Sequence, residues 1–439
     1  MGAVLGTLAA YNEGMDQPTF PSAIVLVQRT DLFDAFRQEL KELKVPAIIA
    51  PEGLELTTAA LEKYPGALFV VDWSLGVGKV TKLLAATQQP LRSAIRPIFL
   101  FSVDEADELD GVAAEYSVTR VYRGQITRNI IRENLSQIAA AEILPEAIRD
   151  AYVAIQAAAV GGDEKTAGLL LAKLHTDNPG LPRVAQDYAE YLFASDDFVT
   201  ALSVVTPLAA LPDASPRSLN LLGRIQLKAG QFDDASVTLN RAKLINPFNI
   251  DRLCALGDAF LNLDMFDHAK EAFETALKHD PKGDEAVGGM GKTLLLNGDI
   301  NDALVFMKQL SGPREMASVF NSAAVIAMRG KRYGEGSNLY NVALRTVGTD
   351  PKVLSKLAYN MGIGFYRKKD IKTAHECFAI AVKLDERNKK AKTNYDMHLA
   401  KLGAVTISEE KTALIERLMA INTSKGHLAE AGANVDEAS

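Results

Sequence analysis

A segment that recurs at a constant interval of about 34 residues is the strongest constraint that this sequence places on its fold. Segments of similar sequence follow one another at this interval and begin at Ile148, Pro182, Pro216, Ile250 and Asp284. Small and apolar residues recur at fixed offsets inside them, as Leu222-Gly223 and Leu256-Gly257 illustrate. Ordinary helical bundles do not hold one register over five consecutive starts. The sequence therefore predicts stacked copies of one helical unit.

The unit closely resembles the tetratricopeptide repeat, a family of paired helices that stack into a superhelix. The segments favour Gly or Ala at the eighth position and Ala at the twentieth, where paired helices cross closely. Large residues at positions 11 and 24 fill the space between the helices, and a proline ends the second helix. We predict about seven repeats over residues 148–388 and a polar capping helix over 389–403, in an all-α solenoid domain at 145–403.

The preceding part of the chain has a different texture, in which strand-like and helix-like segments alternate between residues 22 and 140. Near-continuous apolar strands separated by amphipathic helices indicate a parallel sheet with helices on both faces. We predict a doubly wound, flavodoxin-like α/β domain, in which a site would lie beyond the carboxyl ends of the strands. The predicted strands lie at 23–28, 46–51, 67–72, 96–102 and 118–122.

Composition and the chain ends limit the partners that we expect. The net charge of −7 gives no global cationic field for nucleic acid, and no apolar run is long enough to span a bilayer. The two cysteines are far apart, which fits a reducing compartment. We therefore predict a cytoplasmic protein without nucleic-acid or membrane partners. Residues 1–21 read as a flexible leader, and residues 404–439 as a helix (408–421) followed by a disordered tail.

One carboxylate, Asp72, closes the apolar segment 67–72 and so lies where a parallel sheet places its site. Ser102 closes the next apolar strand in the same way. Residues 22–140 resemble the receiver domain of response regulators, a family in which an aspartate at the end of the third strand accepts a phosphoryl group. The resemblance implies that Asp72 is the phosphoacceptor-like position and that Ser102 is the Ser or Thr that senses the phosphate.

Other positions depart from the receiver pattern. Gln28 and Arg29 stand where the family has the acidic pair that holds Mg²⁺, and Arg123 replaces the lysine of the family motif. One carboxylate with an amide and a guanidinium does not make a magnesium cage. We predict a pseudo-receiver without a cofactor, in which Asp72 pairs with Arg29 or Arg123. The alternative is a functional response regulator, phosphorylated on Asp72 with Mg²⁺, that controls protein binding by the repeats.

Two glycine-containing stretches resemble phosphate-binding loops but lack the required context. Residues 286–296 contain Gly291-Lys292-Thr293, which resembles the end of a phosphate-binding loop. However, Ala286 stands where the motif needs its first glycine, and a predicted helix, rather than a strand, precedes the stretch. Residues 76–79 also lack the first glycine, because Trp73 occupies its place. No Cys/His pair or metal-ligand spacing occurs elsewhere, so we predict that the protein is not an enzyme.

The concave face of the repeats is the predicted binding site. In the resembled family, groove residues lie at positions 2, 5, 9, 12 and 13 of the repeat, often with position 6. These positions are rich in Asn, Lys and Arg although the chain is acidic, which favours a peptide that carries carboxylates. A solvated face and a nucleic-acid groove are the alternatives. Carried onto this chain, the groove positions include Asn220, Arg224, Lys228, Asp258, Asn262, Lys292, Asn321, Arg329, Asn360, Tyr366 and Arg367.

Together these features predict a bacterial, non-enzymatic signalling adaptor of a two-component type, in which a degenerate receiver is fused to a peptide-binding solenoid. Its partner would be a protein with an acidic peptide segment. By analogy of fold, the receiver face near Tyr122 and Ile126 could also bind a second protein or a second copy of the chain.

Overall fold

The computed structural model describes residues 20–402, except residues 65, 90, 92–95, 105–108, 141–143, 311 and 349. The predicted leader lies almost wholly outside the described residues, as do the predicted C-terminal helix and tail at 404–439. The chain divides into two compact units, Met1–Leu256 and Gly257–Ser439. The first unit combines the α/β part with the first helix pairs, and the predicted boundaries near residues 140–145 and 403 stay predictions.

The α/β part is built on a five-stranded parallel sheet with strand order β2-β1-β3-β4-β5. Because consecutive parallel strands need helical crossovers, the parallel arrangement agrees with the alternation of apolar strands and amphipathic helices in the sequence. The chain reverses its direction of travel across the sheet beside β1, which creates a switch point at the carboxyl edge between β1 and β3. The strands are β1 (Ala23–Leu26), β2 (Ile48–Ile49), β3 (Leu68–Asp72), β4 (Ile98–Ser102) and β5 (Arg120–Arg123).

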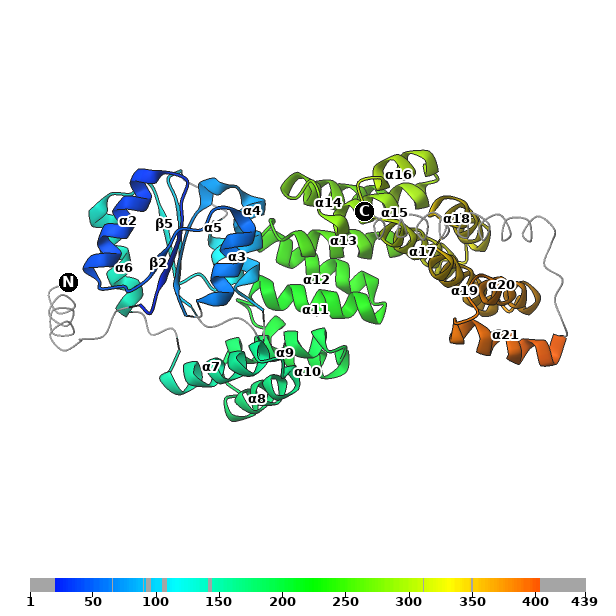
Figure 1. The fold of residues 1–439 in the computed structure, drawn as a ribbon, viewed down its shortest axis with the longest axis horizontal. Helices are drawn as coiled ribbons and strands as arrows, with labels where there is room; N and C mark the ends of the chain where they lie inside the picture. The colour runs from blue at the N-terminus through cyan, green and yellow to red at the C-terminus, as the bar shows by residue number, and fades with distance from the viewer. Residues whose placement is uncertain are drawn as a thin grey trace, which may run out of the picture. The chain divides into compact units, whose positions relative to one another are not determined.

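Helices cover both faces of this sheet (Figure 1). Phe36 and Leu135, from α2 and α6, lie in a buried cluster on one face, whereas Leu61, Leu84 and Val112 lie in the cluster on the other. Residues of β3 alternate between the two clusters, as a strand buried on both faces requires. The helices are α2 (Thr30–Glu42), α3 (Gly53–Lys63), the short 3₁₀ helix η1 (Trp73–Leu75), α4 (Val77–Ala86), α5 (Leu109–Tyr116) and α6 (Arg128–Ala140).

From α7 onward the described chain is entirely helical and forms seven successive pairs followed by a single helix. In the first unit the pairs are α7 (Glu146–Val160) with α8 (Glu164–Asp177), α9 (Pro182–Ala194) with α10 (Phe198–Ala209), and α11 (Pro216–Ala229) with α12 (Phe232–Ile245). The division between the units falls within α13 (Ile250–Asn262), which pairs in sequence with α14 (Phe266–His279). The remaining elements are α15 (Asp284–Asn297), α16 (Ile300–Met307), α17 (Pro313–Arg329), α18 (Tyr333–Thr346), α19 (Pro351–Arg367), α20 (Ile371–Leu384) and the final α21 (Lys389–Leu402).

The predicted repeat register holds for α9, α11, α13 and α15 and then changes. The register would start the next first helix at Ser318, but α17 begins earlier, at Pro313. Helix α19 begins at Pro351, which is later than one further repeat counted from Pro313 would place it. The change reflects a shortened α16 of 8 residues and lengthened first helices, α17 and α19, of 17 residues each. Helices α17 and α19 therefore have about one more turn than α11 or α15, which have 14 residues.

Close helix crossing explains the glycine at the eighth position of the repeat. A Cβ atom on Gly257 would lie 2.4 Å from the ring of Phe273, and one on Gly291 would lie 2.7 Å from Met307. Phe273 and Met307 occupy position 24 of the same repeats. Because real Cβ atoms do not approach so closely, a larger residue would require Phe273 or Met307 to move, which agrees with the predicted preference for Gly or Ala at this position. Within the described part of the chain, no helix is both long and apolar enough to cross a membrane.

Candidate functional site

The strand-end carboxylate of Asp72 is buried, with 1% of its surface exposed. Its Oδ1 accepts a hydrogen bond from the backbone N–H of Ser74 at 2.9 Å, and its Oδ2 accepts a longer one from the backbone N–H of Gln28 at 3.4 Å. The first of these bonds caps η1, the 3₁₀ turn that leaves the strand. Asp72 therefore organises two backbone segments at the carboxyl edge of the sheet.

The predicted ion pair of Asp72 with Arg29 or Arg123 is wrong. Arg29 Nε donates to Asp31 Oδ1 at 3.0 Å, and this hydrogen bond lowers the pKa of Asp31. Arg123 Nη2 donates to Asp110 Oδ1 at 2.7 Å, on α5. Both guanidinium groups thus reach carboxylates on the surface, where hydration is kept, rather than the buried one, where it would be lost.

The other receiver-site residues do lie at the same edge of the sheet. Ser102 is buried at the end of β4, and its Cα is in register with that of Arg123 on β5. The side-chain Oε1 of Gln28 lies 3.4 Å from Ser74 Oγ, beside the turn that Asp72 caps. Mg²⁺ requires several hard oxygen ligands. Among these four site residues, Asp72 supplies the one carboxylate, and both oxygens of this carboxylate already accept backbone N–H groups. The four residues therefore do not fit Mg²⁺. Among the described residues, no three His, Cys, Asp or Glu side chains come together as metal ligands would.

The three predicted groove residues of the first unit lie along α11. Asn220 is largely buried, and its Oδ1 lacks a hydrogen-bond partner among the described residues. The guanidinium of Arg224 lies 4.7 Å from the centroid of the Phe193 ring, a cation–π contact. Lys228 is exposed. Of these three side chains, Lys228 is the one directed most freely to solvent.

In the second unit, several predicted groove residues bind one another across neighbouring helices. Lys292 of α15 forms an ion pair with Asp258 of α13. Asn262 Oδ1 accepts a hydrogen bond from Arg329 Nη1 at 3.0 Å. These contacts neutralise charge within the protein and link successive inner helices, so these residues are partly structural.

Asn321 and Asn360 form a second link, between α17 and α19. Asn360 Nδ2 donates to Asn321 Oδ1 at 2.8 Å, and the hydroxyl of buried Tyr340 donates to the same oxygen at 3.0 Å. Burial raises the pKa of Tyr340, so its hydroxyl keeps the proton that it donates. Tyr366 and Arg367, at the end of α19, are exposed, and the Tyr366 ring packs edge-on against His398 at 5.4 Å.

A cavity of about 640 Å³ opens beside the Asn321–Asn360 pair, wholly within the second unit. It lies between the first halves of α17 and α19 and the turn from α20 to α21. Its volume is within the range of small-ligand and peptide side-chain sites. The lining includes polar Ser318, Asn321, Tyr359, Asn360 and Asn388, basic Arg314, Lys352, Lys356 and Lys390, and acidic Asp385.

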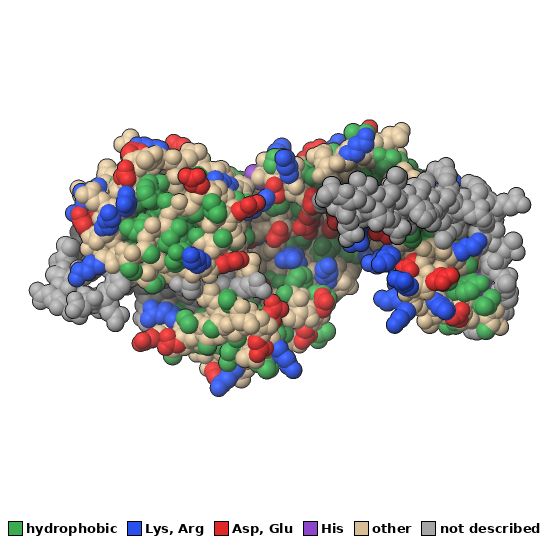
Figure 2. Space-filling view, viewed as in Figure 1, with side chains coloured by type: hydrophobic (Ala, Val, Ile, Leu, Met, Phe, Trp, Pro, Cys, Tyr) green, Lys and Arg blue, Asp and Glu red, His purple; other side chains and the backbone are tan. Residues whose placement is uncertain are grey.

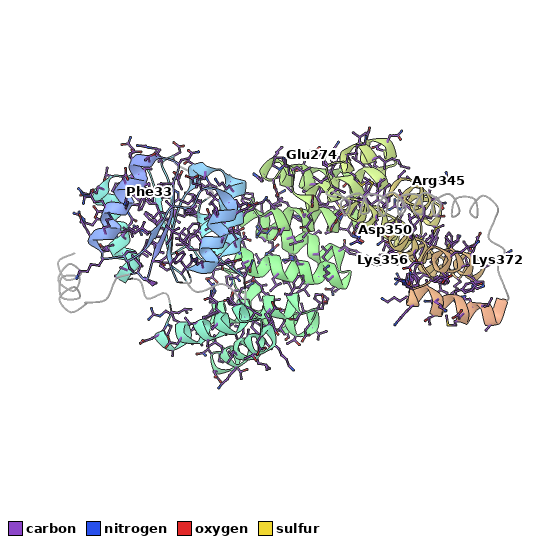
Figure 3. All side chains as sticks on the ribbon, viewed as in Figure 1. Phe33, Glu274, Arg345, Asp350, Lys356 and Lys372 are labelled. Atoms are coloured by element: carbon purple, nitrogen blue, oxygen red, sulfur yellow. The ribbon has the colours of Figure 1, made fainter. Side chains whose placement is uncertain are left out.

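The charges around this cavity are mostly uncompensated. Among the described residues, Lys352, Lys356 and Lys390 form no ion pair, and Arg314 is 76% exposed with Asp350 at 3.7 Å. Residues 351–402 carry twelve Lys and Arg against five Asp and Glu, although the whole chain is acidic. Figure 2 shows Lys and Arg side chains gathered over α19 and α21, and Figure 3 labels Lys356 and Asp350 near the start of α19. The cavity therefore has a positive rim.

Sequence reasoning placed only two of its groove residues, Asn321 and Asn360, in this cavity. It missed Arg314 and Lys352 because both lie on the extra first turn of α17 and α19, before the start of the repeat unit. Lys356 could have been found, since it occupies position 2 of the last repeat if Gly362 is position 8. Lys390 follows the last repeat and carries no signal of a groove position.

The two phosphate-loop-like stretches are parts of helices. Gly291, Lys292 and Thr293 lie inside α15, and the Thr293 hydroxyl donates to the carbonyl of Gly289 at 2.9 Å. The element that precedes them is helix α14 rather than a strand. Residues 76–79 lead into α4. Residues 286–296 therefore present no loop of free N–H groups to a phosphate, because they lie within a helix.

One segment of the helical part matches a known family of repeats. Residues 250–282 match the family model of the tetratricopeptide repeat. The chain is 26% identical over 144 residues to the BBSome complex member BBS4 of Bos taurus, a match that covers 33% of this chain and 27% of that protein's length.

The solved structures that match part of this chain include a tetratricopeptide repeat protein from Parabacteroides merdae ATCC 43184 (13% identity, TM-score 0.40), over 58% of this chain and all of that one. MamA from Desulfovibrio magneticus RS-1 is also similar (17% identity, TM-score 0.34), over 38% of this chain and 93% of that one. The match to the family model shows tetratricopeptide repeat sequence at residues 250–282.

Proposed function

We propose that this protein is a non-enzymatic adaptor whose repeats bind an acidic peptide segment of a partner protein. The observation that carries the proposal is the cavity of the second unit, with its pair of asparagine amides and its three lysines that form no ion pair among the described residues. Lysine ammonium groups would bind the carboxylates of the peptide, and the amides would bind its backbone. A bacterial, cytoplasmic signalling role belongs to the same proposal and rests on the resemblance of the repeats and the α/β domain to signalling modules.

The α/β domain takes the part of a pseudo-receiver in this proposal. Its strand order is that of doubly wound domains with a site at the carboxyl edge, where Asp72 lies. Support for a degenerate site comes from the hydrogen bonds of Asp72, whose two oxygens accept from the backbone N–H groups of Ser74 and Gln28. A second contact, through the face that carries Tyr122 and Ile126, is proposed from fold analogy alone.

Peptide binding is tested with a labelled glutamate-rich peptide and its glutamine counterpart, titrated with the full chain while fluorescence anisotropy is recorded. We expect the glutamate peptide to bind more tightly, and its affinity to fall as salt is added, because exposed charges are screened. Equal affinity for the two peptides, or binding that does not depend on salt, would contradict the proposed chemistry.

The receiver part is tested separately. The full chain is incubated with acetyl phosphate, or with beryllofluoride, in the presence of Mg²⁺, and modification is measured by mass spectrometry and ¹⁹F NMR. We expect no modification of Asp72. Stoichiometric modification that is lost in Asp72→Asn would support the alternative, a response regulator that is switched by phosphorylation.

A further inference from the structure

Helix α5 of the α/β domain lies directly against the backbone of the repeats in the first unit. A Cβ atom added to Gly111, in the first turn of α5, would lie 1.9 Å from the carbonyl oxygen of Ile245 at the end of α12. A backbone atom cannot rotate away as a flexible side chain can. The contact between α5 and α12 therefore depends on glycine at this position.

A buried ionic cluster joins α5 to the turn after α12 and to the first turn of α13. Glu115, on α5, accepts hydrogen bonds from Arg252 Nη2 at 2.6 Å and from the side-chain amides of Asn246 and Asn249 in the turn between α12 and α13. Glu115 is 2% exposed and Arg252 is 1% exposed. A buried charge pair of this kind adds little net stability, but it strongly disfavours any arrangement in which one charge is buried without the other. It therefore fixes how α5 sits on the repeats.

A second anchor lies at predicted groove positions of the repeats. Arg217, at position 2 of its repeat, donates to Gln88 Oε1 of the α/β domain at 2.8 Å. The same guanidinium binds Asp187 at 2.8 Å and Glu190 at 2.6 Å, at positions 6 and 9 of the preceding repeat. These side chains would otherwise face a peptide. Here their charges are used within the protein.

The only tryptophan of the chain takes part in this contact. Trp73 follows Asp72 in η1, and its ring packs edge-on against Phe248, in the turn before α13, with centroids 6.1 Å apart. Tryptophan emission therefore reports on this interface without any label.

We propose that the α/β domain is the built-in partner of the repeats in the first unit, occupying groove positions there so that external peptides are left to the second unit. The surface on the α/β domain consists of α5, Gln88 and Trp73. The surface on the repeats consists of Arg217 on α11, the end of α12, the turn after it and Arg252 on α13. That external peptides are left to the second unit rests on the proposed peptide binding, whereas the docking of the α/β domain on the repeats does not.

The first test uses Gly111→Ala in the full chain. Alanine favours helix more than glycine does, so the substitution leaves α5 intact but forces it away from Ile245. We expect Trp73 emission to shift to longer wavelength, acrylamide quenching to increase, and the α/β domain to unfold apart from the repeats. Gly334→Ala is the matched control, because a Cβ there meets nothing within 4 Å, on α18. It should change none of these measurements.

The second test uses the ionic cluster. Glu115→Gln and Arg252→Met should each lower the unfolding midpoint by on the order of 10 °C, and the double variant should lose less than the two single losses added together. The proposal would be overturned if the losses in unfolding midpoint of the two single variants simply added in the double variant. It would also be overturned if both Gly111→Ala and Glu115→Gln kept an unshifted Trp73 emission and a single unfolding transition. Binding of the glutamate-rich peptide is measured on the same variants, so that failure of docking and failure of peptide binding are told apart.

Discussion

The buried charges around Arg217 in the first unit differ from the charges that line the cavity of the second unit. In the first unit, Arg217 is buried among Asp187 and Glu190. In the second unit, Lys352 and Lys356 line an open cavity and form no ion pair among the described residues. Charges that are paired and buried hold a structure together, whereas unpaired charges of one sign are available to a ligand. The proposed function assigns peptide binding to the second of these two surfaces.

The largest expected effect is on the stability of the first unit. Arg217→Met should lower the free energy of unfolding by about 3–5 kcal/mol, because it leaves the buried carboxylate of Asp187 with less compensating charge. Urea unfolding followed by circular dichroism measures this. Arg314→Met, at an exposed pair in the second unit, is the control and should cost less than about 1 kcal/mol. Equal losses in the two variants would remove the distinction between the units.

Acid should weaken the same cluster only at low pH. Burial opposes ionisation of Asp187, but the charges of Arg183 and Arg217 outweigh it and lower the pKa of the carboxyl group. A group with a lowered folded pKa contributes stability above its unfolded pKa of about 3.9, and this contribution is lost as the pH falls through the folded pKa. Stability measured between pH 7 and pH 2 should therefore start to lose this contribution near pH 4. In Arg217→Met the loss should be smaller.

The next effect is on binding in the second unit. Lys352→Glu combined with Lys356→Glu should weaken binding of the glutamate-rich peptide about tenfold, because two attractive contacts become repulsive. Stability should hardly change, since both side chains are exposed. Anisotropy titration measures the affinity. Lys372→Glu, on α20 and outside the cavity (Figure 3), is the matched control and should bind as the unchanged chain does.

The sequence predicted those parts of the molecule that depend on short-range pattern. The regular spacing located the starts of α9, α11, α13 and α15 to the residue, since glycine and large side chains at fixed offsets dictate how the pairs cross. It failed where the spacing changes, so the extra turns that bring Arg314 and Lys352 to the cavity were missed. It also misjudged Asp72. Side-chain pairing at a strand end depends on loops whose geometry the sequence periodicity does not encode. Here the carboxylate of Asp72 accepts backbone N–H groups instead of pairing with an arginine.

Substitutions of Asp72 test whether a change in the first unit affects binding by the second. Asp72→Ala should lower the free energy of unfolding by about 1 kcal/mol, because the buried N–H of Ser74 loses its acceptor. Asp72→Asn keeps an acceptor oxygen and should lose less. Neither variant should alter affinity for the peptide. Urea unfolding and anisotropy on the same samples test both statements, and weaker peptide binding in Asp72→Ala would show that the two units are coupled.

The smallest expected effect separates two kinds of lysine within the second unit. Lys292 was predicted to line the groove, but its charge is already neutralised by Asp258 on the neighbouring helix. Lys292→Gln should therefore change peptide affinity less than about twofold, while Lys356→Gln should weaken it more, because the Lys356 ammonium forms no ion pair within the described chain. Both substitutions remove one positive charge, so a general electrostatic effect would weaken binding equally. Equal weakening would mean that net charge, rather than the pairing of individual side chains, selects the ligand.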